Sequence, residues 1–327
     1  MIWKVSDASH VGEVRRAATA LAENCGLDET RAGRVAIVAT EMATNLLKHA
    51  GGGDIVVQRV ADKDGDCLEL MAFDAGPGIA SPERAFEDGF STAGSPGTGL
   101  GAIRRQCDHL ALWSRPRLGT AIMARFKVGP ATEAAASVGY VMAPYPGETA
   151  IGDAWAFHAA AAGPRLLVAD GSGHGPQAAA AAAAALRTFD QHRVTGSVQL
   201  VEAIHGALRP TRGAAIAVAE VDLAQRLVRF VGIGNIAGAL ITGDKCQRMV
   251  SHNGIAGHVA SRIREFTYPF SGAATLVLHS DGLSAKWNPD AFPGLMSSHP
   301  SLIAGMLFRE HRRERDDACV VAMRVVA

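Results

Sequence analysis

The sequence lacks several features that would point to one class of protein. Its five cysteines are scattered at positions 25, 67, 107, 246 and 319, so no CxxC zinc or redox pair is present. Basic and acidic residues both number 32, which leaves no charge excess for nucleic acid. No apolar run reaches 18 residues, and the first sixteen residues hold no apolar signal core. We therefore expect a cytoplasmic protein with free thiols, without a nucleic-acid partner or membrane insertion.

The length of 327 residues, with 48% hydrophobic residues, predicts two packed domains. Hydrophobic spacing predicts helices over 11–24 and 30–49, then a mostly antiparallel sheet with a helix over 99–108, which makes 1–128 an α+β domain. The stretch 129–136 is rich in small residues and is predicted to be a linker. Many short strands and helices over 176–192, 197–208 and 299–311 follow, so 137–327 is predicted to hold packed sheets flanked by helices.

A glycine-rich stretch at 89–108, GFSTAGSPGTGLGAIRRQCD, has the composition of a phosphate-binding loop. It is not a P-loop, because no Lys-Ser or Lys-Thr pair follows its glycines. Gly97, Gly99 and Ala102 match the letters of a dinucleotide fingerprint, but the preceding residues do not resemble the strand that this motif requires. A nucleotide site here therefore needs partners elsewhere in the domain.

Two earlier segments carry such partners. Glu41 and Asn45 lie four residues apart in a predicted helix, where a carboxylate can serve as a base and an amide oxygen can bind Mg²⁺. Asp74 ends a predicted strand and is followed by Gly76 and Gly78. A carboxylate at that position can accept the adenine amino group, and the glycines allow the backbone to approach the ring. In isolation these residues would be an exposed helix pair and a turn.

The ordered set Glu-x-x-x-Asn, Asp-x-Gly-x-Gly and a glycine-rich loop resembles the GHKL ATPases, and in particular the RsbT-like switch serine kinases of bacterial partner-switching modules. The resemblance implies a GHKL (Bergerat) α/β sandwich that binds ATP with Mg²⁺ at Asn45. It also implies that the loop covers the phosphates and that Thr120 lies near the adenine. The expected nucleotide-binding residues are Asn45, Asp74, Gly76, Gly78, Gly97, Thr98, Gly99, Leu100, Gly101 and Thr120.

Acidic residues recur at strand ends in the second half. Asp153 lies between two predicted strands, Asp170 and Asp281 end strands, and Asp316 with Asp317 precedes the last strand. Each residue alone could be a turn, a helix cap or a surface charge. Together they can meet at one sheet edge, where their mutual repulsion calls for divalent cations.

The ordered set G-D, D-G-x-G-H-G, S-D-G and D-D resembles the metal-dependent PPM (type 2C) phosphatases, in the SpoIIE and RsbX branch. The resemblance implies an α-β-β-α sandwich with two Mn²⁺ or Mg²⁺ ions, and catalysis by Asp153, Asp170, Asp281 and Asp316. Asp153 would bridge both metals; Asp170 and the Gly171 carbonyl would bind one, and Asp281 and Asp316 the other. Ser172 occupies the position of a histidine found in larger relatives, and His174 could be either a general acid or a residue that fixes the loop.

The two resemblances together predict a bifunctional partner-switching regulator. The first domain would phosphorylate a Ser or Thr of a STAS-domain antagonist or stressosome-type protein, with Glu41 as base, and the second would dephosphorylate the same or a related protein in a sigma-factor or stress cascade. The alternative is a phosphatase whose first domain is a non-catalytic, ATP-binding docking module of the anti-sigma type. A gyrase-type ATPase is disfavoured, because the chain has no transducer domain and no basic excess.

Overall fold

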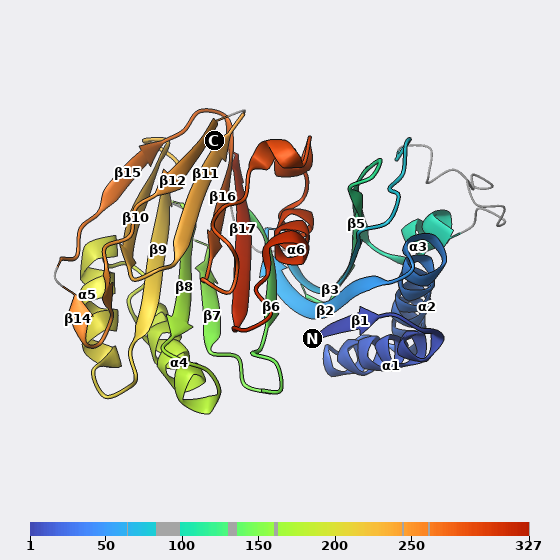
Figure 1. Cartoon of the computed structure of the whole chain (residues 1–327), viewed down its shortest axis with the longest axis horizontal. Coiled ribbons are helices and arrows are strands. Elements are labelled where there is room, and N and C mark those ends of the chain that lie inside the picture. Colours follow the sequence, from blue (N-terminus) through green and yellow to red (C-terminus); the bar gives the residue numbers. More distant parts are fainter. Residues whose placement is uncertain are drawn as a thin grey trace. The chain divides into compact units, whose positions relative to one another are not determined.

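The computed structural model describes residues 1–63, 65–82, 99–129, 136–159, 163–243, 245–260 and 262–326 (Figure 1). By its internal contacts the chain divides into two compact units. Unit 1 consists of Met1–Thr132 together with Pro289–Arg309, and unit 2 of Glu133–Asn288 together with Glu310–Ala327. The second unit is therefore interrupted by a segment that packs within the first.

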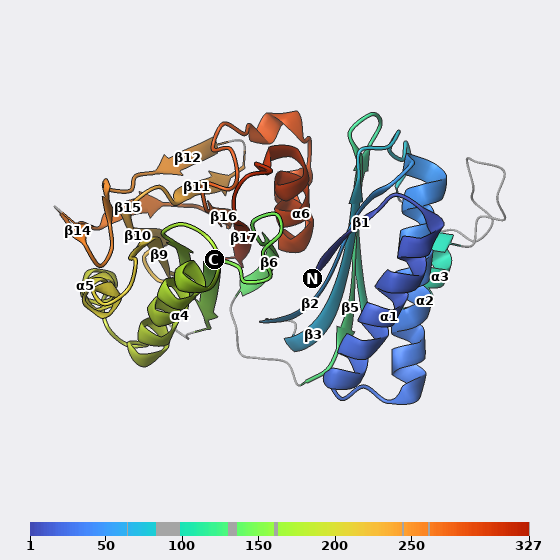
Figure 2. The ribbon, with the colours of Figure 1, turned by 60° about the horizontal axis from the view of Figure 1, so that its bottom comes forward.

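Unit 1 contains a five-stranded antiparallel sheet with the strand order β1-β2-β3-β5-β4. Its elements before residue 130 are β1 (Ile2–Val5), α1 (Ala8–Asn24), α2 (Glu29–Asn45), η1 (Leu46–Ala50), β2 (Gly53–Asp62), β3 (Gly65–Asp74), α3 (Gly99–Gln106), β4 (His109–Arg115) and β5 (Gly119–Lys127). Helices α1, α2 and α3 lie on one face of this sheet (Figure 2).

The two long helices of unit 1 begin where the sequence supplies capping aspartates. The Asp7 side chain accepts a hydrogen bond from the backbone of Ser9, and Asp28 accepts one from the backbone of Arg31. The apolar stripe of α2 faces the sheet, and its buried members include Val35, Val38 and Met42. This packing fixes the orientation of α2 and hence of the polar residues at its C-terminal end.

The other face of this sheet is covered by the segment that returns from the C-terminal part of the chain. It comprises η3 (Pro289–Ala291), η4 (Leu295–Ser297) and most of α6 (Pro300–His311). Figure 2 shows α6 on the side of the sheet opposite α1 and α2. The ring of Phe308 lies edge-to-face against Phe73 of β3, with 6.4 Å between centroids, and Phe292 packs in the same way on Trp113 of β4.

Unit 2 contains two five-stranded sheets with the orders β15-β10-β9-β8-β7 and β12-β11-β16-β17-β6. Its strands are β6 (Ala136–Ala143), β7 (Asp153–His158), β8 (Arg165–Gly171), β9 (Ala214–Asp222), β10 (Leu227–Ile233), β11 (Ala237–Thr242), β12 (Lys245–Met249), β15 (Phe266–Pro269), β16 (Ala273–His279) and β17 (Ala318–Val326), with a small pair β13 (Gly254–Ile255) and β14 (Val259–Ala260). Its helices are α4 (Pro176–Gln191) and α5 (Ser197–Leu208).

Alternating side chains of β8 show how the layers of unit 2 are built. Leu166 and Val168 enter the core between the two sheets, whereas Leu167 and Ala169 face the helices α4 and α5. The alanine-rich α4 buries small side chains such as Ala181 and Ala185 against this sheet. The first sheet is therefore covered by helices on one face and by the second sheet on the other.

The expected fold class, a two-domain α+β chain with a GHKL-type sandwich before a PPM-type sandwich, is confirmed. Three local expectations needed correction. A strand, β1, precedes the first helix. The helix expected over 30–49 is α-helical only to Asn45, after which Leu46–Ala50 forms a π-helical turn that ends at Gly51 in the left-handed region. The helix at 300–311, placed by sequence in the second domain, belongs mostly to unit 1.

Candidate functional site

The first candidate site is centred on Asp74, the last residue of β3. Asp74 lies opposite Thr120 at the start of β5, and its Oδ1 accepts a hydrogen bond of 2.7 Å from the backbone of Gly76. Burial raises the pKa of the Asp74 carboxyl, although the Gly76 hydrogen bond and the nearby Arg309 act in the opposite direction. A half-buried carboxylate with one oxygen already oriented is suited to accept a hydrogen bond from the amino group of a nucleotide base.

Thr120 is held in place by a serine that the sequence did not single out. The Thr120 and Ser114 hydroxyl oxygens lie 2.9 Å apart, and Ser114 also donates to the Gly119 carbonyl and accepts from the Ile79 backbone. Ser114 is 1% exposed, so this small network is shielded from water. It ties β4 and β5 to the loop that follows Asp74.

Gly76 and Gly78 are required by the packing of the chain itself. A Cβ on Gly76 would lie 2.7 Å from the Cβ of Ala50, and Gly78 has a φ of +73° with the Arg115 carbonyl 2.0 Å from its Cβ position. Neither position accepts a larger residue without movement of the backbone. Their role in approaching a nucleotide ring remains a prediction.

Glu41 and Asn45 occupy successive turns at the C-terminal end of α2, and both are half-buried. The η1 turn then brings the chain back to the sheet: a Cβ on Gly53 would lie 2.7 Å from Leu46 and 3.3 Å from the Asp74 Cβ. The structure therefore brings the end of α2 to the end of β3. The carboxylates of Glu41 and Asp74 and the amide of Asn45 are the polar groups that this corner offers.

The structure describes only the last part of the glycine-rich loop. Gly97 and Thr98 lie outside the described residues, whereas Gly99 begins α3. Leu100 packs against the unit 1 core, and Gly101 is buried in the first turn of α3, which packs on α2. Their expected contacts with phosphate remain predictions.

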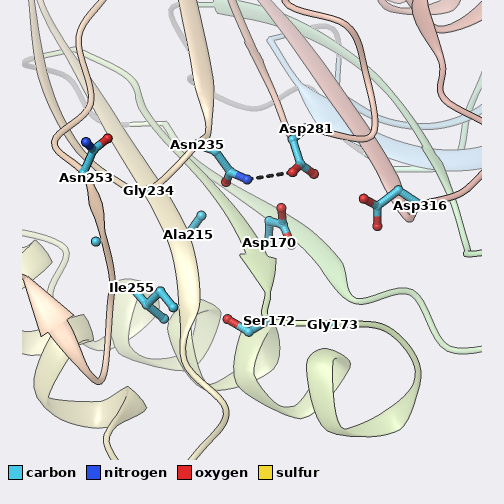
Figure 3. A pocket seen from close by; sticks show the side chains of 11 residues that line it. Asp170, Ser172, Gly173, Ala215, Gly234, Asn235, Asn253, Ile255, Asp281 and Asp316 are labelled. Atoms are coloured by element: carbon cyan, nitrogen blue, oxygen red, sulfur yellow. Dashed lines mark hydrogen bonds between the residues drawn. The ribbon is translucent and has the colours of Figure 1, made fainter.

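The second candidate site is an acidic cavity of about 540 Å³ in unit 2. Asp170, Asp281 and Asp316 line it, and Figure 3 shows their carboxylates turned toward one another beside Asn235. Asp153 is 2% exposed and is the cross-strand partner of Asp170. Four carboxylates that are far apart in the sequence therefore meet at the ends of β7, β8, β16 and β17.

Burial and mutual repulsion shift the acidities of this group. Burial first, and then the neighbouring carboxylates, raise the pKa of Asp170 to about 9 and that of Asp153 to about 7. Burial and the charge of Asp281 also raise the pKa of Asp316. Such a cluster is stable in its charged form only if positive charge is added to it.

Neutral groups hold the acidic side chains in position. Ser280 Oγ donates to Asp153 Oδ2 at 2.6 Å and accepts from the backbone of Cys319 at 3.0 Å. Asn235 Nδ2 donates to Asp281 Oδ2 at 2.7 Å. Sequence reasoning did not select Ser280 or Asn235, although Ser280 directly precedes Asp281 and Asn235 lies in the GIGN turn.

The residues present fit divalent cations in their chemistry. Carboxylate oxygens are the preferred ligands of Mg²⁺ and Mn²⁺. Two buried oxygens, Asp153 Oδ1 and Asp317 Oδ2, have no hydrogen-bond partner within the described part of the chain. Among the same residues no group of three or more His, Cys, Asp or Glu side chains is close enough to enclose a metal ion as it stands. The carboxylate oxygens therefore lie in one region of unit 2. Which of them bind a metal ion, and whether the Gly171 carbonyl does, stay predictions.

Two neighbours of this cluster have structural partners. Asp317 is 3% exposed and its Oδ1 accepts from the Tyr145 backbone, so the second residue of the Asp-Asp pair connects β17 to the loop after β6. His174 lies beside Glu148, with 3.2 Å between Nδ1 and Oε1, and stacks on Tyr145 with 4.3 Å between ring centroids. These contacts are those expected of a residue that fixes the loop, and the general-acid role of His174 stays a prediction.

None of the helices in the described ranges is long and apolar enough to cross a membrane.

Comparisons with known proteins match both halves of the chain. Residues 5–126 match the family of histidine kinase-like ATPase domains, and residues 162–326, half of the chain, match the stage II sporulation protein E (SpoIIE) family. The serine/threonine-protein kinase RsbT of Bacillus subtilis is 36% identical over 104 residues, which cover 32% of this chain and 78% of RsbT.

Two solved structures are similar in fold to more than half of this chain. One, from a study of the bacterial stressosome as a modular system adapted to control secondary messenger signalling, has a TM-score of 0.54 at 28% identity and covers 57% of this chain and 98% of its own. RsbX in complex with magnesium has a TM-score of 0.52 at 17% identity and covers 61% of this chain and 98% of its own. The chain thus belongs to the SpoIIE family of PPM phosphatases through its C-terminal half and to the RsbT family of serine/threonine kinases through its N-terminal domain.

Proposed function

We propose that the chain is a bifunctional regulator of partner switching. Its N-terminal domain would phosphorylate a serine or threonine of a STAS-domain protein with ATP, and its C-terminal domain would remove phosphate from the same or a related protein. The observation that carries the proposal is the acidic cavity lined by Asp170, Asp281 and Asp316, with Asp153 buried opposite Asp170. It occurs in a chain whose first domain is homologous to a protein kinase.

In the phosphatase, the carboxylates at the ends of β7, β8, β16 and β17 would hold two divalent cations, Mn²⁺ or Mg²⁺. When bound, these ions supply positive charge for the substrate phosphate and activate water. The chain itself holds the donors in position through Ser280 and Asn235. The open cavity beside Asp170 and Asp281 leaves room for a phosphorylated side chain of a protein substrate.

In the kinase, Asp74 would accept a hydrogen bond from the adenine amino group, with Thr120 beside it. Asn45 would bind the Mg²⁺ that accompanies ATP, and Glu41, one turn earlier on α2, would accept the proton of the attacking hydroxyl. The phosphoryl group would pass from ATP to that hydroxyl, leaving ADP. The added negative charge of about two units would alter the interface of the STAS protein with its partners.

The test follows the phosphate on a STAS-domain protein encoded near this gene. Wild type, Glu41→Gln and Asp281→Asn are incubated with that protein, labelled ATP and Mg²⁺. Glu13→Gln and Glu202→Gln, at exposed positions on α1 and α5, serve as matched controls. The proposal predicts transient label with wild type and both controls, stable label with Asp281→Asn, and none with Glu41→Gln.

Other outcomes would change the proposal. If no variant labels the protein but wild type removes phosphate from it with Mn²⁺, the first domain is a docking module for this substrate. If the Glu41→Gln variant labels as well as wild type does, Glu41 is not the base. If Asp281→Asn removes phosphate as fast as wild type, the acidic cavity is not the phosphatase site.

A further inference from the structure

The nucleotide site of unit 1 includes a side chain from the far end of the chain. Arg309, near the end of α6, donates through Nη1 to the Asp74 carbonyl and through Nη2 to the Leu118 carbonyl at 2.9 Å. Asp74 and Leu118 belong to the two chain segments that meet where β3 ends and β5 begins. One guanidinium group therefore connects the end of β3 to the turn before β5.

The geometry around this guanidinium leaves little freedom. Gly119 has a φ of +84°, and a Cβ there would lie 1.9 Å from the Asp74 carbonyl and 2.5 Å from Arg309 Nη1. The next residue, Thr120, is the cross-strand partner of Asp74. Any movement of the turn at 117–119 would therefore move Thr120 relative to the Asp74 carboxyl.

The segment that carries Arg309 is firmly anchored in unit 1. Ser301 Oγ donates to Glu69 Oε2 at 2.6 Å, the Trp113 indole donates to the Pro293 carbonyl at 3.2 Å, and Gly305 packs against the ring of Phe73. Phe308, the neighbour of Arg309, is 2% exposed in contact with the same ring. The backbone of α6 thus holds the guanidinium in a fixed position.

We propose that Arg309 is a positioning residue for nucleotide recognition. It keeps the Asp74 carboxyl and Thr120 in the arrangement that accepts the adenine amino group, so the ATP site is completed by a segment from the C-terminal half. The proposal rests on the proposed function of unit 1 as an ATP-binding kinase. It goes further, because a kinase domain that ended near residue 128 would lack this residue.

The distinguishing prediction concerns the base and not the phosphates. Inosine triphosphate carries an oxygen where ATP carries the amino group, so it cannot donate that hydrogen bond to Asp74. If Arg309 acts by positioning Asp74, its loss weakens ATP binding and leaves inosine triphosphate binding nearly unchanged. A general loss of structure would weaken both nucleotides equally.

The experiment measures dissociation constants of the Mg²⁺ complexes of both nucleotides for the full chain. Wild type is compared with Arg309→Ala, Arg309→Lys, Asp74→Asn and Arg34→Ala, the last an exposed arginine of α2 as the matched control. We expect Arg309→Ala to lose about tenfold in ATP affinity with less than about twofold change for inosine triphosphate. Arg309→Lys, which still has a cationic donor, should recover part of the loss, and Arg34→Ala should bind as wild type.

The outcomes separate this inference from the proposed function. If wild type binds ATP and Asp74→Asn does not, but Arg309→Ala and Arg309→Lys both bind ATP as wild type does, Arg309 has no positioning role. The same conclusion follows if both nucleotides weaken equally in the arginine variants. If wild type itself binds neither nucleotide, the assignment of unit 1 as an ATP site is wrong, and this inference is wrong with it.

Discussion

The two units each bury a cluster of charges, and the clusters are built differently. In unit 1, Arg125 is 0% exposed and donates from Nε to Glu69 at 2.7 Å and from Nη1 to Asp62 at 3.0 Å. Ser301 donates a further hydrogen bond to Glu69. In unit 2, Asp153 and its neighbouring aspartates are held by a serine and an asparagine. The first cluster contains its own cation, whereas the second gathers negative charge.

The pKa values of the two clusters reflect this difference. Burial alone would raise the pKa of Glu69, but Arg125, His299 and the hydrogen bonds from Ser301 and Arg125 outweigh it and lower that pKa. Burial and like charges instead raise the pKa of Asp153 and Asp170. A neutralised buried cluster thus serves the fold, while a cluster of uncompensated acids indicates a ligand of positive charge.

Removing the cation of the unit 1 cluster should have the largest effect on stability. Arg125→Met leaves Glu69 and Asp62 buried without their partner, and we expect a loss of about 3–5 kcal/mol in the free energy of unfolding. Denaturant unfolding of the full chain, with the exposed Arg34→Met as control, measures it. Adding Glu69→Gln to the variant should restore part of the loss, and a cost below about 1 kcal/mol would mean that the ion pairs contribute little.

Removing one acid of the unit 2 cluster should act on activity and not on stability. We expect Asp153→Asn to lower phosphatase activity with Mn²⁺ by about 100-fold or more, since even residues that support metal ligands contribute 10- to 100-fold. The metal-free chain should unfold at the same or a higher temperature, because a buried repulsive charge has been removed. A destabilised variant with normal activity would reverse the roles given to the two clusters.

Loss of Ser280 should have a smaller effect on the unit 2 cluster than loss of one of its acids. Ser280→Ala removes the hydrogen bond to Asp153, and we expect about a tenfold weaker affinity for Mn²⁺. Ser301→Ala is the matched control, because it removes a buried serine from the unit 1 cluster. Calorimetry should show normal Mn²⁺ affinity for Ser301→Ala, and equal effects of the two variants would argue against a specific role for Ser280.

Acidification should give the smallest effect. The folded-state pKa of Glu69 lies below its ordinary value of 4.5, so its contribution to stability is present above that value and is lost as the pH falls through the folded pKa. Thermal unfolding from neutral pH to about pH 3 should show a steeper loss for wild type than for Glu69→Gln. If the unfolding temperatures of the two proteins fall in parallel with pH, Glu69 does not take up a proton on unfolding.

The periodic parts of the fold were predictable from the sequence, because the apolar spacing of α2 and the spaced β-branched residues of strands such as β9 carry the information locally. The strand β1 was missed, since its four residues are too few to show a pattern. The placement of 289–309 in unit 1 depends on contacts between Ser301 and Glu69 and between Phe308 and Phe73, which are more than 200 residues apart. No local signal encodes such pairing.

In the two candidate sites, too, the sequence identified some residues and only the structure identified others. Asp153, Asp170, Asp281 and Asp316 were selected because each stands at a strand end within a recognisable order, and the structure brings them together. Ser280, Asn235, Ser114 and Arg309 were not selected, because a serine, an amide or an arginine beside a motif has many ordinary explanations. Only their hydrogen bonds in three dimensions show that they position the acidic residues or the strand ends.

The metal dependence of the acidic cluster is tested most directly by calorimetric titration of Mn²⁺ into the metal-free chain, compared with titration into Asp153→Asn. We expect wild type to bind Mn²⁺, with a rise in unfolding temperature, and Asp153→Asn to lose most of this affinity. Arg125→Met, if folded under the conditions used, should bind as wild type does. Absence of Mn²⁺ and Mg²⁺ binding to wild type, or binding that is unchanged in Asp153→Asn, would contradict the claim that the acidic cluster of unit 2 is a metal-dependent site.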